Sequence, residues 1–250
     1  MYHLAAFNSS IANGTVLLQV TNVADIILAT SNKGFFVKDT IPNLAYVFAA
    51  GVNLTRFQLS SGSIRKMFPW DFDSVNVGAL LENPVRFHDF SQAPIPLDPN
   101  EEIDAYCVQS NAGAQQEYIF ACFSDGPLRP VSGRIQTMHA TGTTTLTANG
   151  WTAVPLTLDN GLDGGLYSLV GLHGFSAGAL AGRVVPRGNS AYRPGVPFAQ
   201  ARDQAKPNPW RYGMWGEMVQ FPNTAVPQVE FFSVSADTAE EVYLDLIKLR

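Results

Sequence analysis

Residues 103–123 read IDAYCVQSNAGAQQEYIFACF, and residues 229–247 read VEFFSVSADTAEEVYLDLI. In each stretch an apolar run, a short polar linker and a second apolar run follow one another, and the two stretches start 126 positions apart. Short runs rich in Val, Ile, Phe and Tyr, separated by turn-forming residues, are typical of β-strands. The pattern predicts a β-hairpin that closes each half of the chain, and therefore a duplicated all-β unit.

A second correspondence and a linker support this duplication. Tyr46 and Gly51 bracket an apolar run, and Tyr167 and Gly171 bracket another about 120 positions later. Between the halves, residues 125–130 read DGPLRP, in which the glycine favours a turn and the two prolines cannot donate to a β-ladder. We therefore expect two domains, residues 1–126 and residues 127–250.

Short strand-like runs occur throughout both halves, with Asn, Asp, Gly and Pro between them. The predicted strands before the closing stretches are 15–20, 25–29, 34–38, 46–53, 56–59, 75–79 and 85–90, then 134–140, 143–147, 151–158, 166–172, 179–185 and 218–221. Long loops are expected at 60–74 and 186–216. About eight strands per half predicts two tandem eight-stranded jelly-roll β-sandwiches, a double jelly roll. An immunoglobulin-like pair, with about seven strands per domain, is the competing architecture.

The composition narrows the class of protein. With 46% hydrophobic and 15% charged residues, the chain is globular, and its net charge of −5 argues against nucleic-acid binding by the whole surface. The first residues lack the basic and apolar regions of a signal peptide, and the longest apolar run, 44–52, is far short of the roughly 20 residues of a membrane span. Cys107 and Cys122 are expected to be free, buried thiols, which suits folding in a reducing cytosol.

The catalytic motifs that the sequence offers are incomplete. Residues 174–178, GFSAG, match the G-x-S-x-G elbow of α/β-hydrolases, but that fold needs a histidine after Ser176, and all four histidines precede it. The histidines and cysteines lack metal-ligand spacing. We therefore predict no enzymatic activity and assign no cofactor. Carboxylates cluster at Asp98, Glu101, Glu102 and Asp104, and at Asp71 and Asp73. They could be glycosidase acids or calcium ligands. A solvated loop is the favoured interpretation, and bound Ca²⁺ stays open.

The basic, aromatic segment 183–216 is the candidate interaction site. Trp, Tyr, Met and Arg are the residues that subunit interfaces concentrate. The predicted interface residues are Arg183, Arg187, Arg193, Arg202, Lys206, Trp210, Arg211 and Trp215. Two other roles stay open for the tryptophans: core packing, and, together with Trp151, stacking on sugar rings as in a carbohydrate-binding sandwich.

Three features of the sequence carry a resemblance to a known family: the duplicated closing hairpins, the linker 125–130, and the segment 192–195 (YRPG) in a long loop of the second half. Together they resemble the double jelly-roll major capsid proteins of icosahedral viruses, of the bacteriophage-like adenovirus, tectivirus and corticovirus type. The resemblance covers the whole chain and is architectural, without a short diagnostic motif.

This resemblance implies a virion shell protein, made in the host cytoplasm, that forms homotrimers as pseudo-hexameric capsomers and self-assembles into an icosahedral shell. It also implies minor capsid or penton proteins as partners, and leaves contact with an internal membrane or the genome open. The alternative function is a two-domain β-sandwich that binds carbohydrate. An enzyme that uses Ser176 or the acidic loops ranks third.

Overall fold

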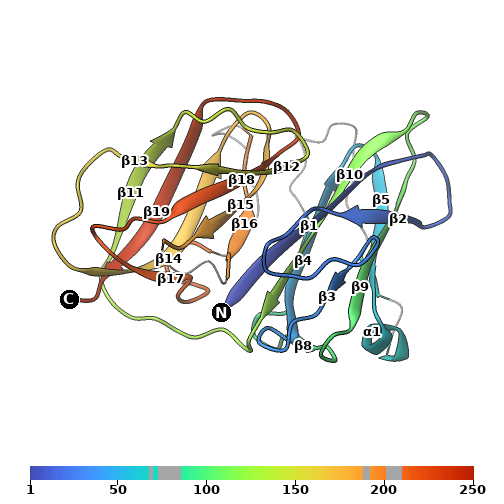
Figure 1. Cartoon of the computed structure of the whole chain (residues 1–250), viewed down its shortest axis with the longest axis horizontal. Coiled ribbons are helices and arrows are strands. Elements are labelled where there is room, and N and C mark those ends of the chain that lie inside the picture. Colours follow the sequence, from blue (N-terminus) through green and yellow to red (C-terminus); the bar gives the residue numbers. More distant parts are fainter. Residues whose placement is uncertain (68–69, 73–85, 188–191, 201–209) are drawn as a thin grey trace. The chain divides into compact units, whose positions relative to one another are not determined.

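The computed structural model describes residues 1–67, 70–72, 86–187, 192–200 and 210–250, with the backbone alone at 65–67, 70–72 and 86. Nearly all of its regular elements are strands (Figure 1). The chain divides into two compact units. The first unit comprises His3–Pro127, and the second comprises Leu128–Arg250 together with Met1 and Tyr2. No helix among the described residues has the length and apolar character needed to cross a bilayer.

The first unit contains ten strands and one short helix among its described residues. They are β1 (Tyr2–Ile11, which starts one residue outside the unit), β2 (Leu18–Asn22), β3 (Phe35–Phe36), β4 (Asn43–Gly51), β5 (Leu54–Ser60), α1 (Gly62–Met67), β6 (Trp70–Phe72), β7 (Arg86–Asp89), β8 (Ile95–Pro96), β9 (Glu102–Gln109) and β10 (Gln115–Ser124). One row of strands runs β1-β10-β4-β7 and the other runs β2-β9-β5-β6, and the pairing of β1 with β2 joins the rows.

The second unit contains two separate sheets. Its strands are β11 (Ile135–Gly142), β12 (Gly150–Val154), β13 (Thr157–Leu158), β14 (Leu166–Phe175), β15 (Ala179–Val185), β16 (Gly195–Pro197), β17 (Val219–Pro222), β18 (Gln228–Ser233) and β19 (Glu240–Lys248). One sheet runs β13-β11-β19-β14-β17 and the other β12-β18-β15-β16.

The two units share one strand order. When the short strands β3, β8 and β13 are set aside, each unit places its first, eighth, third and sixth strands in one row and its second, seventh, fourth and fifth in the other. Every strand pair with a determined register is antiparallel, as in β10 with β4 and β19 with β14. The predicted all-β class is therefore confirmed, and the order is that of a jelly-roll sandwich.

Apolar side chains between the two rows account for this order. In the second unit Val242, Leu244 and Leu246 of β19 alternate along the strand and are fully buried, as a sheet with one face toward a core requires. Stacked rings fill part of the first unit: Phe48 of β4 lies with its ring centroid 4.6 Å from that of Phe120 of β10 and 6.1 Å from that of Phe87 of β7. Burial of such rings is a main stabilising term.

The predicted closing hairpins are wrong in one respect. The four strands exist and lie where expected, but β9 and β10 do not pair with each other, and neither do β18 and β19. Each pair instead crosses from one row of strands to the other. In the first unit the fully buried Gln109 holds this crossover, because its side-chain amide donates to the carbonyl oxygens of Ile11 (2.9 Å) and Gly113 (3.1 Å).

Other expectations had mixed outcomes. Cys107 and Cys122 are free and buried, as predicted. Asp25–Ala29 is a turn and not a strand, because the Asp25 carboxylate accepts hydrogen bonds from the backbone N–H groups of Ile27 and Leu28. The predicted loops 60–74 and 186–216 contain α1, β6 and β16. The predicted strand 75–79 lies outside the described residues.

Glu117 of β10 is a fully buried carboxyl group inside the first unit. It pairs in register with Gly51 of β4, and its carboxyl group occupies the space that a Cβ atom at Gly51 would need. Within the described part of the chain, neither of its oxygens has a hydrogen-bond partner. Burial raises the pKa of Glu117 to about 9, so the group is held protonated at neutral pH.

We predict that Glu117→Gln stabilises the first unit increasingly as the pH rises. The unfolded chain loses the Glu117 proton above a pKa of 4.5 and the folded unit only near 9, so the wild type loses stability between these values. At pH 7 this costs on the order of 3 kcal/mol. Urea unfolding at pH 5 and pH 8 measures the effect. Parallel pH profiles for the two proteins would contradict the expectation.

Candidate functional site

The structure places the predicted interface residues mostly inside the second unit. Trp210 is fully buried and Trp215 nearly so, with 6% of its surface exposed. Their ring centroids lie 5.7 Å apart, and the ring of Tyr2 meets that of Trp210 edge-on at 4.9 Å. Arg202 and Lys206 lie outside the described residues. A substitution at Trp210 therefore tests the packing of this unit before any subunit contact, and the interface role of the set stays a prediction.

Arg183 and Arg193 share one carboxylate. Arg183 Nε of β15 and Arg193 Nη1 of the following loop each lie 2.5 Å from an oxygen of Glu230 on β18, and all three residues are buried. The guanidinium group of Arg183 also lies 4.1 Å from the centroid of the Trp151 ring, in cation–π geometry. The cluster fixes the loop that carries Arg193 to the sheet.

Arg211 belongs to a turn over the outer face of β19. Arg211 Nε donates to Asp245 Oδ2 at 2.8 Å, and the backbone N–H of Tyr212 donates to the same oxygen at 2.8 Å. From the neighbouring strand β11, the hydroxyl group of Thr137 donates to Asp245 Oδ1 at 2.7 Å. Because the Asp245 side chain is fully buried, these donors supply the hydrogen bonds that water cannot.

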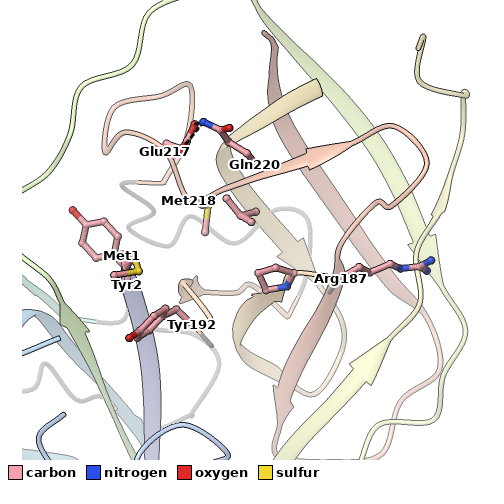
Figure 2. Close-up of a pocket in the computed structure, with 9 residues that line it drawn as sticks. Met1, Tyr2, Arg187, Tyr192, Glu217, Met218 and Gln220 are labelled. Carbon is pink, nitrogen blue, oxygen red and sulfur yellow. Dashed lines mark hydrogen bonds between the residues drawn. The ribbon is translucent and has the colours of Figure 1, made fainter. Parts of the chain in front are cut away.

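Arg187 borders a small pocket of about 330 Å³ (Figure 2). Met1, Tyr2 and Tyr192 lie on one side of it and Met218 on another, while the Arg187 side chain points away. Glu217 and Gln220 form a polar edge, where Gln220 Nε2 donates to Glu217 Oε2 at 2.9 Å. The described lining combines apolar residues with this polar edge, and within it no nucleophile has an adjacent base.

Several candidate residues of the carbohydrate and enzyme hypotheses pack within the second unit. Trp210 and Trp215 are buried, and Trp151 lies against Arg183 and against Phe232, whose ring centroid is 5.2 Å away. Ser176 is buried in the turn between β14 and β15, and its hydroxyl group donates to Asp237 Oδ2 at 2.6 Å. That hydroxyl supports a turn and is not poised for proton transfer to a histidine.

The acidic residues of the first unit have structural partners. Glu101 accepts hydrogen bonds from the Ser63 hydroxyl (2.6 Å) and the Asp98 N–H (2.9 Å). Burial alone would raise the pKa of Glu101, but these bonds together lower it. Asp104 accepts a bond from Gln19. Asp73 and the Asp71 side chain lie outside the described part, in which no three His, Cys, Asp or Glu residues are grouped to hold a metal ion.

Comparisons with known proteins do not assign this chain to a family. No protein-family profile and no curated protein matches the sequence. Among solved structures, the chain is similar to the crystal structure of the major capsid protein P2 from Bacteriophage PM2, at 13% identity and a TM-score of 0.23. The match covers 99% of this chain and 97% of that chain. A TM-score this low shows neither a shared fold nor a shared function.

Sequence reasoning missed the residues that organise this region. Glu230 and Asp245 lie on the closing strands β18 and β19 and are not among the predicted site residues. A signal was present, because both carboxylates interrupt strongly apolar strands. A charge at such a position requires a buried partner. The sequence does not reveal that these partners lie 34 to 47 residues earlier.

We predict that Glu230→Gln destabilises the second unit by about 3–5 kcal/mol, because it leaves two buried guanidinium groups without their shared carboxylate. Urea denaturation at pH 7 measures this loss. Asp163→Asn is the matched control: Asp163 is 91% exposed and 4.0 Å from Lys248, and pairs of this kind contribute little. Equal stability of the two variants would show that the Glu230 cluster is not a stabilising centre.

Proposed function

We propose that this protein is a major capsid protein of the double jelly-roll type: a shell subunit that trimerises into pseudo-hexameric capsomers and self-assembles into an icosahedral shell. The observation that carries the proposal is the repetition, in one chain, of the same eight-strand order in two units. Two such units in each of three chains supply six similar blocks, which is what a pseudo-hexagonal building block requires. Each unit is interpreted as one jelly roll, and the domains as residues 1–126 and 127–250.

The chemistry of the described residues agrees with a structural role. The candidate nucleophile Ser176 and the carboxylate of Glu101 form hydrogen bonds within the fold, and Trp210 and Trp215 are buried. In the basic segment, Arg183, Arg193 and Arg211 are paired with Glu230 and Asp245. A shell subunit acts through rigid, shape-complementary contacts and needs no reactive group. Closed symmetry of one repeated subunit then builds the assembly.

The proposed partners follow from this role. The protein associates first with itself as a homotrimer and then with further copies in the lattice. Minor capsid or penton proteins complete the shell, and contact of its inner face with an internal membrane or the genome stays open. Its place is the virion, after synthesis in the host cytoplasm.

We predict that the purified protein is a trimer or a larger particle. Light scattering coupled to size-exclusion chromatography should give three times the mass of one chain or a particle in the megadalton range, and electron micrographs should show rings or shells. A stable monomer at high concentration would overturn the proposal. A monomer whose melting temperature rises with a glycan would favour the carbohydrate-binding alternative, and ester hydrolysis abolished by Ser176→Ala would favour an enzyme.

A further inference from the structure

A rigid turn of the second unit displays two apolar side chains. The turn spans residues 210–216, and Tyr212 and Met214 are 60% and 71% exposed. Trp210 and Trp215 are buried on either side of them. Backbone hydrogen bonds from Gly213 N to Val170 O (3.0 Å) and from Leu172 N to Trp210 O (2.6 Å) fix the turn to β14. The exposure of Tyr212 and Met214 is therefore a feature of a well-held segment and not of a loose one.

The backbone at Tyr212 adopts a conformation that costs free energy. Its φ angle is +55°, in the left-handed region that a bulky residue rarely occupies. The Asp245 carboxylate holds the residue there through the Tyr212 N–H, and Gly171 beside Asp245 leaves the carboxylate the space that a Cβ atom would fill. A glycine at position 212 would avoid the cost. The presence of tyrosine at position 212, in spite of this cost, indicates that the exposed ring has a function.

An aromatic depression of about 480 Å³ lies next to the turn, on the outer face of β11, β19 and β14. It is lined by Thr137, His173, Phe175, Arg211, Tyr212 and Tyr243. The rings contact one another: Phe175 is 4.4 Å from His173 and 5.9 Å from Tyr243 between centroids. An exposed apolar tip thus lies beside an open aromatic hollow on the same unit.

The charged residue that lines the depression, Arg211, has an acidic partner. Arg211 is paired with Asp245, and its guanidinium group lies 4.5 Å from the centroid of the Tyr212 ring. Burial and the nearby Arg211 charge lower the pKa of His173 to about 4, so its ring is neutral at physiological pH. The depression therefore presents a paired charge and a neutral imidazole to a second copy, which lowers the electrostatic cost of contact there.

We propose that the tip formed by Tyr212 and Met214 docks into the aromatic depression of a second copy of this chain. The occupant is a second copy because one unit carries both halves of the contact, a protruding apolar tip and a hollow lined by rings. Such a contact joins two copies as a two-fold symmetric pair, or joins several copies head to tail in a closed ring. Tyr and Met are also residues that interface centres concentrate. This inference rests on the self-association proposed above and names the surface that performs it.

Substitutions at the tip test the inference by sedimentation velocity across a concentration series. We expect Tyr212→Ala combined with Met214→Ala to weaken association about tenfold or more, as expected for central interface residues. Val16→Ala combined with Ile26→Ala is the matched control, because these residues of the first unit are 71% and 63% exposed. The control should assemble as the wild type does.

Tyr212→Gly separates docking from folding. Glycine relieves the left-handed backbone at position 212, so this variant should melt at the same or a higher temperature while it associates as weakly as the alanine variant. A lower melting temperature together with unchanged association would show that the ring serves the fold and would overturn the inference.

Cross-linking tests the orientation of the contact. A mixture of Met214→Cys and Phe175→Cys chains should form disulfide-linked pairs under mild oxidation, whereas a mixture of Met214→Cys and Ile26→Cys chains should not. The native Cys107 and Cys122 do not interfere because both are buried. If the wild type is a monomer, the proposed function fails. If the wild type assembles while the tip variants assemble equally well or the first mixture gives no cross-link, this inference alone fails.

Discussion

The last strand of each unit lies between the first and the third, and the rest of the architecture depends on this position. β10 is bordered by β1 and β4, and β19 by β11 and β14. Because a central strand forms ladders on both edges, its insertion completes one sheet and brings segments from the whole unit together. The same constraint forces the seventh strand into the opposite row. A hairpin between the seventh and eighth strands is therefore excluded, although the two are neighbours in sequence.

Two buried carboxylates lie on the closing strands of the second unit. Glu230 of β18 fixes the loop that carries Arg193, and Asp245 of β19 fixes the turn that carries Arg211 and Tyr212. Each carboxylate is on a rigid strand, and each partner comes from an irregular segment. The long connection between β15 and β17 is thus held to the sandwich at two points by charge-assisted hydrogen bonds, which are stronger than neutral ones. Tyr212 and Met214, which this connection exposes, are therefore held in a defined geometry.

The sequence predicted the fold class but not the partners of each strand or of each buried charge, for physical reasons. The closing strands are long and apolar, so their existence could be predicted from 103–108 and 229–234. β6 and β16 span three residues each, which is too short for a periodic pattern, and they were expected to be loops. The partner row of each strand depends on contacts between residues that are distant in sequence, which a local pattern does not contain.

The predicted interface residues illustrate the same limit. A sequence shows that Arg183, Arg193 and Arg211 carry charge, but not that acidic partners on the closing strands neutralise them. Tyr212 and Met214, which the structure exposes, lie in the same segment but are not among the predicted interface residues. The amino-acid composition thus singles out residues 183–216 as a candidate segment, and the backbone geometry determines which of its side chains are exposed to solvent.

The central position of the last strand also determines when each unit can close as the chain leaves the ribosome. The first unit has all its strands once Ser124 has emerged, before β11 begins at Ile135. In both units the first strand waits for the last: β1 ends at Ile11 and its neighbour β10 begins only at Gln115, and Thr137 of β11 waits for Asp245 of β19, 108 residues later. Contacts of such sequence separation form slowly, and uncovered strand edges invite pairing with other chains. Each half of the nascent chain therefore needs protection from premature association until its own last strand has emerged.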